Sequence, residues 1–250
     1  MNIVISEWIK IRSVRSTWVM VASTAVVTVL VSLVGVTGLI GDGAVAPAAF
    51  DPTAAGFKGI LVGQLVIAAL GSQAITAEYA SGQIISTLTL VPRRRTLLLA
   101  KLAVVAMVAV PTAIVTVAAA FGASQATLAA AGWPTATLGD PDVVRALACA
   151  VVYLVLASVL GLAFGTITRS SSGALAVIVT VALLIPALAP GIPGIIGQVV
   201  GTYWPTTAGQ ASYTVVANGS ILPLAGLAVL TVATVWTAVA ATLVFLRRDA

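Results

Sequence analysis

The sequence contains few residues that could do chemistry. Among its 250 residues there is no histidine, one cysteine (Cys149) and seven acidic residues. Without histidine there is no imidazole base, no histidine metal ligand and no Ser-His-Asp triad, and one cysteine cannot form an intrachain disulfide. We therefore expect no catalytic residue and no metal site. The polar residues of interest are those that could bind a partner or line a path.

The clearest polar pattern lies between residues 78 and 92, just before three successive arginines. At 100° per residue, two arcs separate on a helical wheel. The apolar arc holds Ala80, Ile84, Ile85, Leu88 and Val91, and the polar arc holds Tyr79, Gly82, Gln83, Ser86 and Thr89. Glu78 lies at the favourable N-terminal end of this helix, and Pro92 ends it. A half-polar helix predicts a surface for a soluble partner. The alternative is a loop that returns the chain, with the arginines anchored to lipid.

A second amphipathic helix is predicted over residues 3–16. Its apolar arc holds Val4, Ile5, Trp8, Ile9 and Ile11, opposite Ser6, Glu7, Lys10 and Ser13. Arg12 and Arg15 lie on the apolar side, where their stems can rest in the membrane interface while their guanidinium groups reach lipid phosphate. We expect a helix lying on the inner leaflet. A simple basic topology anchor is the alternative.

Polar stripes also occur inside two apolar stretches. One stretch holds Thr24, Thr28 and Ser32, and the other holds Gln64, Ser72 and Gln73. Such stripes either line a substrate path or form hydrogen bonds within and between packed helices, and packing is the commoner role.

The composition identifies the elements that must position these residues. The chain is 60% hydrophobic and 8% charged, with a mean hydropathy of +1.15. Soluble domains carry about 25% charged residues. The sequence therefore indicates an integral membrane protein and excludes a soluble enzyme, a disordered chain and a disulfide-rich secreted domain.

We expect an all-α membrane protein in a single domain over residues 1–250. A span needs about 20 apolar residues, so the charge-free intervals set the number of helices. They predict six spans, at about 18–40, 59–77, 97–121, 143–168, 173–189 and 221–246. The apolar segment 190–205 is too short to cross and is rich in glycine and proline. It predicts a re-entrant segment before the sixth span, with an irregular loop as the alternative.

The basic residues set the orientation. With a cytoplasmic N-terminus, ten basic residues lie inside, against Lys58 and Arg145 outside. The ten are Lys10, Arg12, Arg15, Arg93, Arg94, Arg95, Lys101, Arg169, Arg247 and Arg248. This bias predicts that both termini are cytoplasmic. The net charge of +5 then reports topology and not nucleic-acid binding. A signal peptide cleaved near Ala44-Val45-Ala46 is disfavoured, because the preceding apolar run is about twice the usual length.

Several of these features resemble the permease subunits of type 2 ATP-binding-cassette (ABC) transporters, which are mostly exporters. The resembling parts are the six spans, Ser6-Glu7-Trp8-Ile9-Lys10-Ile11-Arg12, and the stretch from Glu78-Tyr79-x-x-Gly82 to Pro92-Arg93-Arg94-Arg95-x-Leu97-Leu98-Leu99-Ala100-Lys101. The order of helices resembles that of the family over the whole chain, whereas the resemblance in sequence is specific only over residues 5–18 and 76–102. After the glycine that corresponds to Gly82, the family often has Thr-Leu-Glu or a similar acidic sequence, whereas this chain has the uncharged Gln83-Ile84-Ile85.

The resemblance implies roles for these segments. The stretch after the second span would be a coupling helix that docks on an ATPase, flanked by an N-terminal elbow helix. The docking residues it implies are Glu78, Tyr79, Gly82, Gln83, Ser86, Thr87, Arg93 and Arg94. The elbow residues are Glu7, Trp8, Lys10, Arg12 and Arg15. Segment 190–205 would close the outer end of the path.

We therefore expect the permease subunit of an ATP-driven exporter, a multi-pass protein of a prokaryotic cytoplasmic membrane. No Gly-x-x-x-x-Gly-Lys-Ser/Thr loop occurs, so the chain would bind no cofactor itself. ATP and Mg²⁺ would belong to separate ATPase subunits, and the second permease would be an identical or paralogous copy. No acidic residue lies at mid-span, which argues against proton coupling. The alternatives are a secondary transporter without an ATPase and a membrane scaffold or assembly protein. Cargo and direction of transport are not specified by the sequence.

Overall fold

The computed structural model describes residues 3–41, 45–90, 93–216 and 221–247. Ala44, Val91, Pro92 and Arg248, which enter the sequence argument, lie outside these ranges. All regular elements in the described ranges are helical, and no strand occurs there.

Within the described ranges, six helical segments are long and apolar enough to cross a membrane, as the charge-free intervals predict. They are α2 (Arg15–Ile40), α4 (Ile60–Ala80), α6 (Arg94–Ala130), α7 (Val143–Thr168), the run Ser171–Gly191, and α12 (Pro223–Arg247). The fifth run consists of α8 (Ser171–Val179), a π-helical turn (Thr180–Leu184), α9 (Ile185–Leu188) and a 3₁₀ turn (Ala189–Gly191). The π turn precedes Pro186, whose ring cannot fit against a regular preceding turn.

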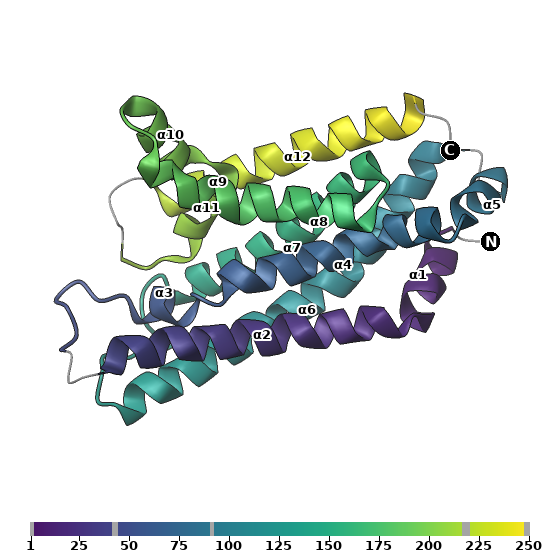
Figure 1. Ribbon diagram of the computed structural model, residues 1–250. Coiled ribbons are helices and arrows are strands. Elements are labelled where there is room, and N and C mark those ends of the chain that lie inside the picture. The colour runs from purple at the N-terminus through teal and green to yellow at the C-terminus, as the bar shows by residue number, and fades with distance from the viewer. Residues whose placement is uncertain (1–2, 42–44, 91–92, 217–220, 248–250) are drawn as a thin grey trace.

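Helices α4 and α7 form the centre of the bundle, and α2, the fifth run and α12 lie around them (Figure 1). Gly71 and Gly161 make the central crossing possible. A Cβ at Gly161 would overlap the carbonyl of Ala68 on α4, and a Cβ at Gly71 would overlap the carbonyl of Ser158 on α7. The close approach of the two backbones therefore requires glycine on both sides.

Helix α6 extends to Ala130, beyond the range 97–121 that we expected. The extension is rich in alanine, the best helix former. Its polar residues are used in tertiary contacts: the Gln125 amide nitrogen donates to the Pro52 carbonyl (3.0 Å), and its amide oxygen accepts from the Ala136 amide (2.8 Å). The first bond attaches the far end of α6 to the short helix α3 (Pro52–Gly56), and the second attaches it to the loop that follows α6.

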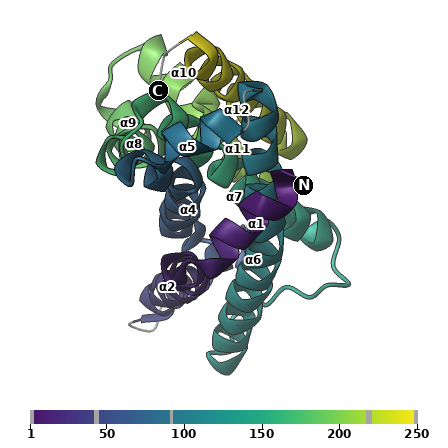
Figure 2. The same ribbon diagram turned by 90° about the vertical axis from the view of Figure 1, so that its right-hand side faces the viewer.

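The bundle has two distinct ends (Figure 1). The end that we call the basic end carries α1 (Ile3–Ser13), α5 (Gln83–Leu90), the start of α6 and the last turn of α12. Figure 2 looks onto this end and shows α1 crossing between α2 and α6, with α5 beside α4. The opposite end carries α3, α10 (Ile195–Tyr203) and α11 (Pro205–Gln210). Both α10 and α11 are too short to cross a membrane. The re-entrant placement of segment 190–205 stays a prediction.

Candidate functional site

The helix α5 presents one side to the bundle and one side to the surroundings. It follows α4 after a turn at Ser81-Gly82. Gly82 has φ = 72°, a backbone angle that residues other than glycine rarely adopt. Ile84 is buried in a small core that includes Ile75 of α4, Leu97 of α6 and Phe245 of α12. This packing attaches α5 to three membrane helices.

The opposite side of α5 is exposed, and we call it the α5 face. It consists of Gly82, Gln83, Ile85, Ser86 and Thr89. Ile85 belongs to the apolar arc of the helical wheel, yet it is 60% exposed. The reason is that Ile84 and Leu88, one turn apart, occupy the side toward the bundle, and Ile85 lies about 100° away from Ile84.

The remaining docking candidates flank the α5 face. Thr87 is half-buried and Arg93 is exposed. Arg94 is half-buried, and its Nη1 donates to the carbonyl of Phe245 at 3.2 Å, which joins the start of α6 to the end of α12. Tyr79 lies on α4, half-buried, with the guanidinium of Arg169 5.2 Å from its ring centroid.

Glu78 does not lie at the N-terminal end of the amphipathic helix, where the sequence analysis placed it, because α5 begins only at Gln83. It lies in the last turn of α4, is only 5% exposed, and points into a group of four charged side chains. Its carboxylate is therefore not available to a partner in this structure.

We call these four side chains the ion-pair cluster: Glu7, Lys10, Glu78 and Lys101. Lys101 lies at its centre, 1% exposed, with its Nζ 2.7 Å from Glu7 Oε2 and 2.7 Å from Glu78 Oε1. The same Nζ donates to the carbonyl of Ala74 at 2.9 Å. Lys10 Nζ lies 2.6 Å from Glu7 Oε1 and 2.8 Å from Glu78 Oε1. Two cations and two carboxylates thus join α1, α4 and α6.

Two members of the cluster on α1 have shifted pKa values. Burial would raise the pKa of the Glu7 carboxyl, but the charges and hydrogen bonds of Lys101 and Lys10 outweigh burial and hold this pKa below its ordinary value. Burial would lower the pKa of the Lys10 ammonium, but its hydrogen bonds to Glu7 and Glu78 raise the pKa above its ordinary value. The cluster therefore favours the charged form of both groups.

A helix, α1, covers most of the segment predicted as an elbow helix, but it ends at Ser13, earlier than the expected boundary at residue 16. Its placement on the membrane surface stays a prediction. Val14 is extended, and α2 then begins at Arg15, so Arg15 belongs to the first span. Trp8 is half-buried and Arg12 is exposed, and the Arg12 carbonyl accepts from the indole nitrogen of Trp18 at 3.0 Å. On the apolar arc, Ile5 and Ile9 are exposed.

The polar stripe of α2 is used for helix packing. Thr24, Thr28 and Ser32 are fully buried. Thr24 and Thr28 donate to carbonyls one turn back, at 2.8 and 2.6 Å, and the Ser32 hydroxyl accepts from the amide of Gly59 at 3.1 Å. This is the packing role that the sequence favoured.

The polar residues of α4 divide into two groups. Gln64 and Ser72 are buried, where Gln64 accepts from the Tyr153 hydroxyl and Ser72 donates to the carbonyl of Ala69. Gln73 lies instead on a cavity of about 270 Å³ between α1, α2 and α4, together with Glu7, Lys10 and Glu78. Gln73 is therefore the path candidate that lines this cavity of about 270 Å³ beside the ion-pair cluster.

The opposite end has a polar arrangement that sequence reasoning missed. Asp51 Oδ1 accepts from the amides of Thr53 and Ala54, both at 3.0 Å, and so caps α3. Its Oδ2 accepts from the amides of Val215 and Val216 at 2.7 and 2.9 Å. A cavity of about 640 Å³ lies nearby, between α2, the start of α4 and the segments α10 to α12.

Comparison with known proteins agrees with this architecture. A search of curated proteins gave no significant match. A family model described as an ABC-2 family transporter protein matches residues 3–187, which include α1, α5 and the ion-pair cluster. The chain therefore belongs to the ABC-2 family of transporter membrane proteins.

Proposed function

We propose that this chain is the permease subunit of an ATP-driven exporter and that a separate ATPase subunit docks on the α5 face. Membership of the family supports a membrane component of a transporter. The observation that carries the docking proposal is the exposed α5 face itself, in which Ile85 is surrounded by Gly82, Gln83, Ser86 and Thr89. An apolar residue with a polar rim is the usual composition of a protein interface.

The ion-pair cluster supports a coupling role for α5. Glu78 lies in the last turn of α4, three residues before the Ser81-Gly82 turn begins and five residues before α5 begins. A displacement of α5 would therefore move the end of α4, and the Glu78–Lys101 contact would carry that displacement to α6. Lys10 extends the connection to α1. Motion of one docking helix would thus reach three further helices.

The arrangement also supports a cytoplasmic basic end and a second permease copy. Arg12, Arg15, Arg93, Arg95 and Arg247 are exposed in the described chain and belong to the helices of this end, as the positive-inside rule predicts for the cytoplasmic side. Helices α2, α12 and the fifth run have few fully buried residues in a single chain. Because the α2 stripe is used in packing, we place the substrate path between two copies and not within one.

Co-purification tests the proposal. The full chain, isolated from its native membrane, should retain an ATPase whose activity is measurable in the purified complex. Ser86→Asp places an unpaired charge in the α5 face and should reduce the retained ATPase activity by roughly tenfold or more, since such a charge in an interface costs over about 1.4 kcal/mol. Thr135→Asp, in the exposed loop at the opposite end, is the matched control.

The result that overturns the proposal is equally defined. If the chain, reconstituted alone in vesicles with no ATPase present, transports a cargo when only an ion gradient is applied, it is a secondary transporter. If Ser86→Asp retains as much ATPase activity as Thr135→Asp, the α5 face is not the docking surface.

A further inference from the structure

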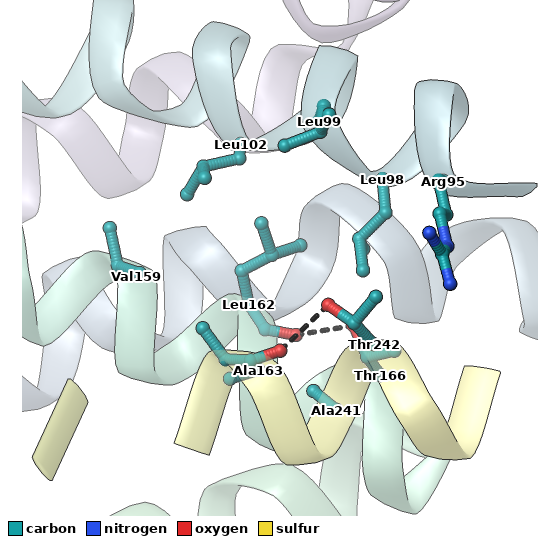
Figure 3. Close-up of a pocket in the computed structure, with 11 residues that line it drawn as sticks. Arg95, Leu98, Leu99, Leu102, Val159, Leu162, Ala163, Thr166, Ala241 and Thr242 are labelled. Atoms are coloured by element: carbon teal, nitrogen blue, oxygen red, sulfur yellow. Dashed lines mark hydrogen bonds between the residues drawn. The ribbon is translucent and has the colours of Figure 1, made fainter. Parts of the chain in front are cut away.

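A narrow cavity of about 150 Å³ lies on the side of the bundle at the basic end, between α6, α7 and α12 (Figure 3). It shares no residue with the α5 face or the ion-pair cluster. Its lining residues on α6 include Leu98, Leu99 and Leu102, with Val159, Leu162 and Ala163 on α7 and Ala238 and Ala241 on α12.

The cavity wall is apolar even where it contains threonine. Thr166 Oγ1 donates to the carbonyl of Leu162 at 2.7 Å, and Thr242 Oγ1 donates to the carbonyl of Ala238 at 2.8 Å (Figure 3). Both hydroxyl groups are thus satisfied within their own helices, and neither requires a polar partner from an occupant. The wall is therefore suited to a hydrocarbon chain.

Arg95 provides the polar end of the cavity. Its side chain is exposed and lies in the first turns of α6 (Figure 3). It forms no hydrogen bond or ion pair with any residue that the structure describes, and no carboxylate lines the cavity. A guanidinium with this freedom can donate two parallel hydrogen bonds to a phosphate group.

The position of the cavity determines the source of the occupant. All three helices that form it are candidate membrane spans, and Leu99 at its rim is 64% exposed. An occupant therefore enters from the bilayer, from the leaflet nearest the basic end. A basic group beside an apolar cleft between membrane helices is the arrangement that binds anionic lipid.

From this geometry we propose that the cavity holds a short segment of one acyl chain of an anionic phospholipid, with the lipid phosphate bound by Arg95. This inference goes beyond the transport function and does not depend on it. The recognised features are one negative charge and one hydrocarbon chain. A soluble phosphate compound lacks the chain, and a neutral lipid headgroup lacks the net charge.

Native mass spectrometry of the full chain tests the proposal. The protein is freed of lipid in detergent and titrated with phosphatidylglycerol or with phosphatidylcholine of the same acyl chains. We expect one phosphatidylglycerol to bind more tightly than phosphatidylcholine. Arg95→Gln should weaken phosphatidylglycerol binding by about fivefold, the effect of one basic residue near a membrane surface, and weaken phosphatidylcholine binding less, because the choline ammonium already neutralises that phosphate. Lys58→Gln, which removes an exposed cation at the opposite end and far from the cavity, is the charge control.

A second pair of variants tests the acyl-chain site. Ala238→Phe places a ring in the cavity from a half-buried position and should weaken both lipids, whereas Val239→Phe, at the next and exposed position of α12, should weaken neither. Because Arg95 is exposed, Arg95→Gln preserves the fold and keeps the test decisive even if Ala238→Phe does not fold.

Three results would overturn the proposal. The first is equal binding of the two lipids by the unmodified protein. The second is unchanged phosphatidylglycerol binding in Arg95→Gln. The third is competition by glycerol 3-phosphate as effective as that by the lipid, which would show that the hydrocarbon chain contributes nothing.

Discussion

Lys101→Met removes the central cation of the ion-pair cluster and should destabilise the chain strongly. The substitution deletes two ion-pair contacts of 2.7 Å, to Glu7 and Glu78, and the 2.9 Å hydrogen bond to the Ala74 carbonyl. Both carboxylates stay buried, with only the half-exposed Lys10 to neutralise them. Removing one partner of a buried ion pair costs about 3–5 kcal/mol.

The assay is a thermal melt of the detergent-purified chain, followed through the fluorescence of its five tryptophans. One kcal/mol shifts the Tm of a chain of this size by roughly 2–4 °C, so Lys101→Met should lower the Tm by roughly 6–20 °C. Lys58→Met makes the same chemical change at an exposed lysine on the opposite end, and it should shift the Tm little.

A double variant separates charge from packing. In Lys101→Met with Glu78→Gln, one carboxylate and one ammonium are left, and Lys10 still lies 2.6 Å from Glu7. The double variant should therefore be less destabilised than the sum of the two single variants by at least about 1 kcal/mol. A Tm for Lys101→Met within 2 °C of that for Lys58→Met, on the scale of roughly 2–4 °C per kcal/mol, would refute the reasoning.

Three further predictions follow from the described contacts. Because the pKa of Glu7 is lowered in the fold, its charge stabilises the fold above the unfolded pKa of about 4.3, and this stabilisation is lost as pH falls through the folded pKa. Because the pKa of Lys10 is raised, its charge stabilises the fold below the unfolded pKa of about 10.4, and this stabilisation is lost as pH rises through the folded pKa. A plot of Tm against pH should therefore show a plateau between these limits, and Glu7→Gln should flatten its acid side. Asp51→Ala removes four backbone hydrogen bonds and should cost about 1–3 kcal/mol, measured as a Tm decrease larger than that of Asp140→Ala, which removes one such bond in an exposed loop. Gly161→Ala forces apart the α4–α7 crossing and should lower the Tm, whereas Gly38→Ala, where nothing lies within 4 Å of the added carbon, should leave it unchanged or raise it slightly; equal shifts would contradict the close-packing explanation.

The elements of the fold follow closely from local sequence properties. Six apolar segments follow from the spacing of charges, because each charge is costly inside a membrane and limits where a span can lie. The amphipathic segment 78–92 indicates the α5 face, because Gly82 turns the chain and Ile84 and Leu88 recur one turn apart. These signals are local, so no tertiary structure is needed to read them.

The boundaries and roles that sequence either missed or left open depend on tertiary contacts. The extension of α6 depends on Gln125 contacting Pro52 and Ala136 from other segments. The Thr24–Thr28–Ser32 stripe has the same spacing whether it faces a path or a neighbouring helix, and only the approach of Gly59 and Gly63 to α2 distinguishes the two. Asp51 contacts Val215 and Val216 from 164 and 165 residues away, a separation at which no local pattern is informative.

The ion-pair cluster had one signal that could have revealed it. From the sequence, Arg93, Arg94 and Arg95 are expected to mark the membrane boundary, whereas Lys101 lies seven residues after Arg94, about 10 Å along an apolar helix. A lysine at that depth requires a carboxylate or carbonyl partner. Only Glu7 and Glu78 supply a carboxylate on the helices of the basic end, since the other acidic residues of the described chain lie toward the opposite end. Because every buried cation needs an anion, the scarcity of acidic residues in this chain identifies the partners of Lys101 more sharply than any periodicity does.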